Sequence, residues 1–127
     1  MKIKLCSIFV DDQEKGLRFY TEVLGFVKKH DFPVGAARWI TVVSPEGPED
    51  VELVLEPNGN PAALAYTKSL REQGIPLTAF AAHDINAEYA RLRERGVVFI
   101  MPPTPAGPTT IAVFDDTCGN LIQIYQG

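Results

Sequence analysis

The stretch IKLCSIFVDDQEKGLRFYTEVLGF, residues Ile3–Phe26, decides the fold. Its first part, Ile3–Val10, alternates between two faces and predicts a β-strand. Asp11 and Asp12 follow, and their carboxylates can accept hydrogen bonds from the free amides of a first helical turn. An apolar stripe at helical spacing comes next: Leu17, Phe19, Tyr20, Val23 and Leu24. Because Gly25 stands where a helix end needs a left-handed residue, the stretch predicts a strand, a tight corner and a helix.

The same pattern returns in the second half of the chain. Residues Ile75–Val98, IPLTAFAAHDINAEYARLRERGVV, again alternate, meet an aspartate and continue as a helical stripe of Ile85, Tyr89 and Leu92. Asp84 would cap this helix and Gly96 would end it. Asp84 follows Asp12 by 72 residues, and Leu77 follows Leu5 by the same interval. The repeat therefore predicts two copies of one module.

The segments after each helix predict further strands. In the first half these are 26–32, 38–43 and 50–56, which complete a βαβββ unit. A connector helix is expected over about 60–74, with Asn60 as its cap and Leu64 and Leu70 as its main apolar contacts. In the second half we expect strands at 97–101, 109–114 and 120–126, with 115–120 as a hairpin turn. The proline-rich PPTPAGP segment is expected to be an ordered loop at a pocket rim. We expect one domain over 1–127, with modules at about 1–57 and 75–127.

Composition limits the classes of function. The chain has 127 residues, of which 46% are hydrophobic and 22% charged, and its formal net charge is −4. That charge argues against a nucleic-acid partner or an anionic membrane surface, and no apolar run approaches membrane-spanning length. The strand pattern begins at once, without a signal peptide, so the expected location is cytoplasmic. Cys6 is expected to be a buried, inert thiol, and Cys118 to be exposed in a turn.

These features together resemble the vicinal-oxygen-chelate superfamily, the glyoxalase, bleomycin-resistance and extradiol-dioxygenase group. The resemblance rests on FYTEVLGF at Phe19–Phe26, VELVLEP at Val51–Pro57 and FDDTCGNLIQI at Phe114–Ile124. It covers the whole chain. It implies an α+β fold in which two paired βαβββ modules form a curled eight-stranded cup, and it usually implies a homodimer.

Metal-dependent members of this superfamily offer a ligand from the first and the last strand of each module. In this chain the four positions read Leu5, Glu52, Leu77 and Gln123. Leucine has no donor atom and a neutral amide is a poor ligand for transition metals, so we expect no metal cofactor. The two histidines do not rescue the site, because His83 falls at the helix corner and His30 on a charged strand. A divalent Zn, Ni, Mn or Fe ion is the alternative.

Alternation along the strands predicts which side chains line the cup. The concave face would carry Leu5, Ser7, Phe9, Glu52, Val54, Glu56, Leu77, Ala79, Ala81, Leu121, Gln123 and Tyr125. The convex, helix-covered face would carry Cys6, Ile8, Val10, Leu53, Leu55, Phe80, Ile122 and Ile124. A mixture of apolar walls with a few polar groups is the usual make-up of a small-molecule pocket. The candidate ligand-binding residues are therefore Ser7, Phe9, Arg38, Trp39, Glu52, Glu56, Gln123 and Tyr125.

Four of these candidates have two interpretations each. Glu52, meeting Gln123 across the cup floor, could be a general base whose pKa is raised by apolar surroundings, or a structural carboxylate satisfied by its neighbours. Trp39 and Tyr125 could each stack on a flat ligand or pack within the sheet. Arg38 could bind a ligand carboxylate or pair with a neighbouring glutamate.

The leading hypothesis is a metal-independent binding protein of the bleomycin-resistance kind that takes a small organic molecule. The alternative is an enzyme: a lyase or isomerase resembling glyoxalase I, or a dioxygenase-like enzyme with a divergent metal site using Glu52. A third hypothesis is a structural or regulatory dimer whose cup is closed. The fold alone does not choose among them, because this architecture hosts many functions.

Overall fold

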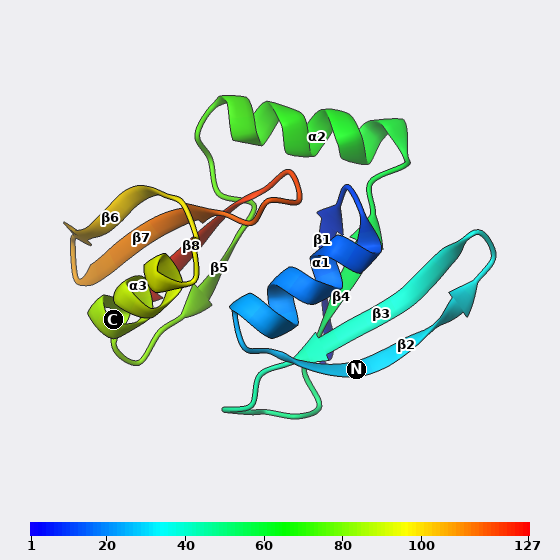
Figure 1. Cartoon of the computed structure of the whole chain (residues 1–127), viewed down its shortest axis with the longest axis horizontal. Coiled ribbons are helices and arrows are strands. Elements are labelled where there is room, and N and C mark those ends of the chain that lie inside the picture. Colours follow the sequence, from blue (N-terminus) through cyan, green and yellow to red (C-terminus); the bar gives the residue numbers. More distant parts are fainter. The chain divides into compact units, whose positions relative to one another are not determined.

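The computed structural model describes all residues 1–127, which form two compact units, Met1–Ala65 (unit 1) and Tyr66–Gly127 (unit 2) (Figure 1). Each unit holds a four-stranded sheet and one helical segment that follows its first strand. The elements of unit 1 are β1 Leu5–Val10, α1 Gln13–Arg18, η1 Phe19–Val23, β2 Val27–Val34, β3 Ala37–Val43 and β4 Glu52–Pro57. The helix α2, Pro61–Glu72, follows. The elements of unit 2 are β5 Thr78–Ala81, α3 Ile85–Glu94, β6 Phe99–Ala106, β7 Thr109–Asp115 and β8 Leu121–Gln126.

Unit 1 forms a mixed sheet in the order β1-β4-β3-β2, with β1 parallel to β4 and the other pairs antiparallel. Asp12 caps α1, because its Oδ1 accepts a hydrogen bond from the Lys15 amide at 3.0 Å. The helix continues as one π-helical turn, η1, and Gly25 then takes a φ of 93°. A residue with a side chain rarely adopts that backbone conformation, so the prediction that Gly25 ends the helix is confirmed.

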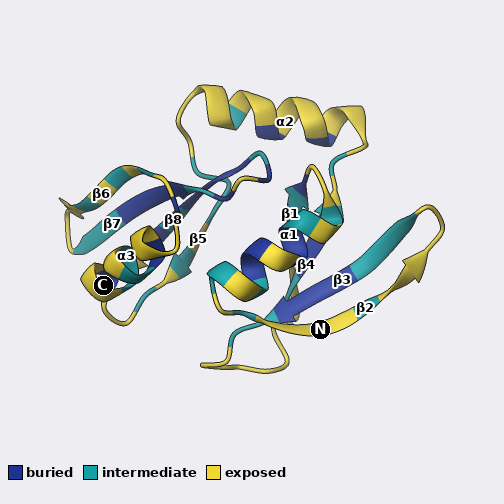
Figure 2. Ribbon diagram, in the orientation of Figure 1, coloured by how far each residue is buried: buried dark blue, intermediate teal, exposed yellow.

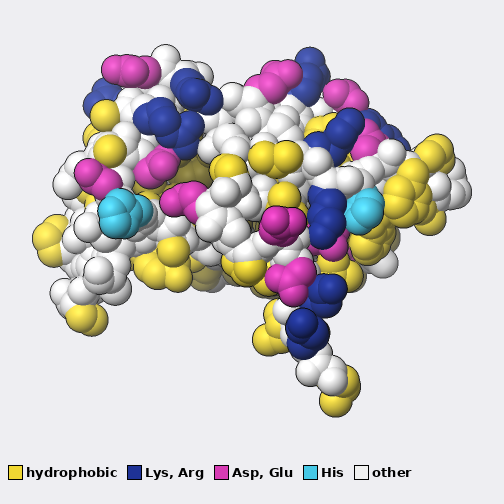
Figure 3. All heavy atoms as spheres, turned by 90° about the horizontal axis from the view of Figure 1, so that it is seen from below, with side chains coloured by type: hydrophobic (Ala, Val, Ile, Leu, Met, Phe, Trp, Pro, Cys, Tyr) yellow, Lys and Arg dark blue, Asp and Glu magenta, His cyan; other side chains and the backbone are white.

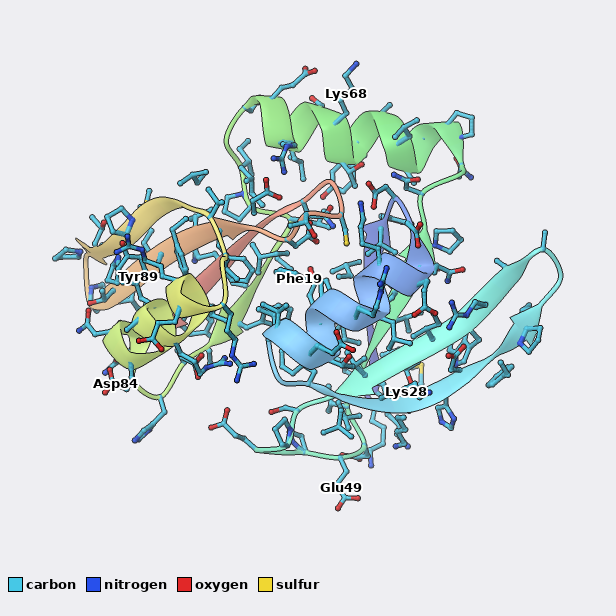
Figure 4. All side chains as sticks on the ribbon, in the orientation of Figure 1. Phe19, Lys28, Glu49, Lys68, Asp84 and Tyr89 are labelled. Atoms are coloured by element: carbon cyan, nitrogen blue, oxygen red, sulfur yellow. The ribbon has the colours of Figure 1, made fainter.

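Unit 2 repeats this arrangement in the order β5-β8-β7-β6, with β5 parallel to β8. Asp84 caps α3 by accepting a hydrogen bond from the Ala87 amide at 3.1 Å, and Gly96 has a φ of 87°. Figure 4 labels Asp84 at the start of α3. The predicted pair of βαβββ modules is confirmed.

Each sheet buries one face under its own helix. In unit 1 a Cβ at Gly16 of α1 would lie 3.1 Å from Val10 Cγ1, so the helix lies directly on this face. The side chains buried on this side are Ile8, Val10, Ile40, Val42 and Leu55. In unit 2 the Tyr89 ring of α3 lies 4.7 Å from the Phe99 ring, above Ala112, Phe114, Ile122 and Ile124. Figure 2 shows the burial concentrated on β3 and β7.

Two expectations about local structure were wrong. Leu64 of α2 is 51% exposed, and the buried positions of that helix are Ala63 and Thr67, because the small side chains take the inward-facing stripe. The proline-rich segment is mostly strand: β6 continues through it to Ala106 and turns at Gly107. Strand β6 tolerates prolines because it is the last strand of its sheet and its pairing with β7 shifts register twice.

The exposure of the two cysteines is also the reverse of what the sequence predicts. Cys6 is exposed, since it lies in the first half of an edge strand that the helix does not cover. Cys118 is buried, because the Asp115–Asn120 turn folds inward. None of the helices combines the length and the apolar character that crossing a lipid bilayer requires.

Candidate functional site

The face of each sheet that lies opposite its helix, here the helix-free face, carries most of the candidate residues. In unit 1 the register places Leu5 beside Glu52, Ser7 beside Val54 and Phe9 beside Glu56, so these six side chains share one face. Thr41 lies opposite Val54 and therefore joins them, as does Trp39 two residues earlier on β3. The predicted division of the strands into two faces is confirmed within each sheet, except that Cys6 is not part of the core.

Glu52 is a largely enclosed charged group on this face. Its side chain is 13% exposed. The hydroxyl of Thr41, a residue with no exposed surface, donates a hydrogen bond of 2.7 Å to Glu52 Oε1. A short hydrogen bond from a fully buried donor fixes the carboxylate in one position.

Two cationic-type side chains flank this carboxylate. Lys29 Nζ lies 3.7 Å from Glu52 Oε2, and His30 Nε2 lies 3.6 Å from Oε1. Adjacent residues in a regular strand point to opposite faces, but the pairing of β2 with β3 shifts between Lys28 and His30. The resulting bulge inserts Lys29 as an extra residue, which brings it to Glu52 together with His30.

These partners of Glu52 are not predicted from the sequence, which puts His30 on a charged strand outside the site. Of the two interpretations of Glu52, apolar surroundings do not agree with the structure; the carboxylate has polar neighbours, which are Thr41, Lys29 and His30. A bulge has no reliable sequence signal here. The one available hint is the run KKHD, which interrupts an otherwise alternating strand.

Aromatic side chains lie next to this polar cluster. Phe32 is paired with Trp39 across β2 and β3, and the His30 and Phe32 rings meet edge to face at 6.2 Å. Phe32 is 48% exposed, and Val27 and Val34 on the same strand are exposed to a similar degree. Figure 3 shows hydrophobic side chains gathered at the outer end of the β2–β3 hairpin. The face therefore combines a polar centre with an apolar margin.

Arg38 lies on the opposite, helix-covered face and has protein partners. Its guanidinium donates to both Asp31 oxygens, at 2.7 and 3.1 Å, and to Glu14 at 2.9 Å. The Arg38 hydrogen bonds hold the pKa of Asp31 below its usual value, and both acids raise the pKa of the guanidinium. Of the two interpretations of Arg38, the structure shows the pairing with neighbouring acids.

In unit 2 the candidate residues Gln123 and Tyr125 lie on the helix-free face of β8. Gln123 pairs with Ala79 on β5 and with Val113 on β7. Glu52, however, pairs with Leu5, whose repeat equivalent is Leu77, and Leu77 meets Leu121. Gln123 therefore corresponds to Val54, and the repeat equivalent of Glu52 is Leu121.

The metal-ligand positions of the resemblance do not fit a metal ion. Leu5 and Leu77 provide no donor atom, and Gln123 provides only a neutral amide. Glu52 is the one carboxylate in the set, and it already accepts the Thr41 hydrogen bond. The structure also holds no group of three or more His, Cys, Asp or Glu side chains placed to bind a metal.

Comparison with known proteins gives consistent matches along the whole chain. The family model described as Glyoxalase/Bleomycin resistance protein/Dioxygenase superfamily matches residues 2–124. The uncharacterized protein YurT of Bacillus subtilis (strain 168) is 58% identical over 126 residues, covering 99% of both chains. A "Probable lactoylglutathione lyase" of Synechocystis is 28% identical, covering 94% of this chain and 90% of that protein. The crystal structure of TnmS3, an antibiotic binding protein from Streptomyces sp. CB03234, is 32% identical with a TM-score of 0.78, covering 99% and 95% of the two chains.

Proposed function

Because the chain belongs to the glyoxalase/bleomycin resistance protein/dioxygenase superfamily, we propose that it binds a small organic molecule without a metal ion. The helix-free face of unit 1 contacts the ligand in this proposal. Its residues are Ser7, Phe9, Trp39, Glu52 and Glu56, together with His30 and Phe32. Gln123 and Tyr125 are the corresponding candidate ligand-binding residues on the helix-free face of unit 2, taken by itself. The protein acts in the cytoplasm as a homodimer.

One observation carries this proposal: a fixed carboxylate with free acceptor capacity lies beside exposed aromatic and aliphatic side chains. A few placed polar groups among apolar side chains are typical of small-molecule sites. The likeness to TnmS3, an antibiotic binding protein, supports binding as the function. The donor-free positions Leu5 and Leu77 support a function without metal.

The single tryptophan of the chain, Trp39, makes a direct test possible. Its fluorescence should respond to any molecule that binds the helix-free face of unit 1, so a library of aromatic compounds can be titrated against the native protein. We expect saturable changes together with a raised melting temperature. Metal content is measured in parallel on protein purified without a histidine tag. Stoichiometric metal that is lost in Glu52→Ala would contradict the proposal.

The second candidate function is a metal-independent lyase or isomerase with Glu52 as general base. The specific observation in its favour is the pair of Glu52 with His30, two groups that can hold and pass a proton, 3.6 Å apart. The Synechocystis relative carries a lyase name at 28% identity. Turnover of hemithioacetal substrates by metal-free protein, abolished in Glu52→Gln, would favour this function over simple binding.

A further inference from the structure

The repeat provides an internal reference for the cluster at Glu52. Thr41 lies opposite His30 and Val54, whereas its equivalent Val113 lies opposite Met101 and Gln123. The positions held by Glu52, Thr41 and His30 in unit 1 are therefore held by Leu121, Val113 and Met101 in unit 2. The same backbone register is built with an apolar trio, so this fold does not require the polar one.

The hydrogen bonding of Glu52 is incomplete. A carboxylate has two oxygens and about four acceptor positions. Glu52 uses one of them, for the Thr41 hydroxyl. Lys29 and His30 approach to 3.7 and 3.6 Å, which gives ion-pair contact without a hydrogen bond.

Lys29 makes its hydrogen bond to a group other than Glu52. Its Nζ donates to the backbone carbonyl of Glu49 at 2.9 Å, in the loop between β3 and β4 (Figure 4). Lys29 therefore has a hydrogen-bond acceptor other than Glu52. The His30 side chain is 45% exposed. The Glu52 carboxylate, 13% exposed and held by Thr41, keeps acceptor positions that neither neighbour fills with a hydrogen bond.

From this geometry we propose that the unit 1 face selects an aromatic ligand that carries a cationic nitrogen, such as an amidine or a protonated amine. The nitrogen would donate a charge-assisted hydrogen bond to Glu52 Oε2, at the shorter distance that Lys29 and His30 do not reach. The aromatic ring would pack on Phe32 and Trp39, which are paired across the strands. Glu56 on the same face adds a second negative charge, which offsets the Lys29 ammonium beside Glu52 and leaves the two acids in excess over that cation.

This inference rests on the proposed function and is tested with three probes of one shape. Benzamidine is cationic, benzamide neutral and benzoate anionic, and ligands of this size bind with Kd on the order of a millimolar. Titrations follow Trp39 fluorescence and backbone amide shifts in NMR spectra. We expect benzamidine to bind about tenfold more tightly than benzamide, since the charged hydrogen bond is the stronger one. Shifts should centre on Thr41 and Glu52 and spare Val113 and Leu121, their equivalents.

Two variants separate the carboxylate from general charge. Glu52→Gln should remove the benzamidine preference while benzamide binding stays, and the retained benzamide binding shows that the face is intact. Glu72→Gln, on the exposed side of α2, changes the net charge equally and should leave the preference unchanged. Tighter binding of benzoate, an unchanged preference in Glu52→Gln, or shifts centred on unit 2 would each overturn the inference. Binding of none of the three probes would also overturn it, whereas the proposed function fails if the wider compound library finds no ligand or if the protein holds stoichiometric metal that is lost in Glu52→Ala.

Discussion

The two units share a backbone plan and differ in what they place on their helix-free faces. Both have an aspartate cap, a helix on the buried face and a glycine with positive φ at the helix end. On the opposite face, unit 1 has His30, Thr41 and Glu52 where unit 2 has Met101, Val113 and Leu121. The two units thus agree on the helix-covered face and at the chain reversals, and they differ on the helix-free face. The residues that differ between the two units on this face are therefore the candidates for function.

The units also differ in how the start of the helix is tied to the sheet. In unit 1 the Gln13 side chain donates to the carbonyls of Arg38 and Leu55 and accepts from the Arg38 amide. Its repeat equivalent is Ile85, which is buried and has no polar side chain. There the Gln126 side chain at the end of β8 accepts from the Ile85 amide at 2.8 Å. The helix start is thus tied to the sheet by a side chain of the helix in unit 1 and by a side chain of the sheet in unit 2.

The largest effect is expected when the two faces are exchanged. Leu121→Glu places a carboxylate at a 5% exposed position opposite Asp115 on β7, where burial and a like charge both oppose it. We therefore expect a loss of about 3 kcal/mol or more in the free energy of unfolding. The double variant Glu52→Leu with Thr41→Val makes unit 1 resemble unit 2 and should stay within about 1 kcal/mol of wild type, since both partners are replaced together. Urea unfolding measures both. Equal losses would show that the cluster at Glu52 is structural.

The turn before the last strand of each unit gives the next contrast. In unit 2 the fully buried Asp116 accepts hydrogen bonds from the Cys118 and Asn120 amides and from the Asn120 side chain. The turn in unit 1 has one comparable contact, from the Glu46 amide to the Ser44 hydroxyl at an exposed site. Asp116→Ala should therefore cost about 2–3 kcal/mol and Ser44→Ala less than about 0.5 kcal/mol. Thermal unfolding of the two variants measures the difference, and similar melting temperatures would contradict it.

Acid stability should depend on unit 1 through Asp31. Arg38 holds the pKa of Asp31 below its ordinary 3.8 in the folded protein. A carboxyl with a lowered folded-state pKa adds stability above its ordinary pKa, and this is lost as the pH falls through the folded-state value. Asp31→Asn should cost about 1 kcal/mol at neutral pH, and its difference from wild type should shrink below about pH 4. Asp50→Asn, whose carboxylate is exposed and has a 3.7 Å contact with Lys2, is the control. A pH-independent difference would contradict the role of this ion pair.

Most of the fold could be predicted from the sequence because its signals are local. Asp12, Asp84, Gly25 and Gly96 each act within one turn of chain, and strand alternation assigns the faces. The environment of Glu52 could not be predicted, because a bulge breaks the alternation and brings His30 across two strands. The resemblance assigns metal-ligand positions to both Glu52 and Gln123. The strand register shows that these two residues are not equivalent in the repeat, because Glu52 pairs with Leu5 and Gln123 pairs with Ala79.

The smallest effect on stability is expected at the cysteines, which also distinguish the units. Cys6 of unit 1 is exposed, whereas Cys118 of unit 2 is 1% exposed. A thiol reagent should therefore label one cysteine per chain in the native protein and a second only in denaturant. Cys6→Ser should abolish the fast labelling and change the free energy of unfolding by less than about 0.5 kcal/mol, as is usual for exposed positions. Native labelling at Cys118, or none at Cys6, would mean that the chain buries these strands differently in solution, and the assignment of the unit 1 face would then need revision.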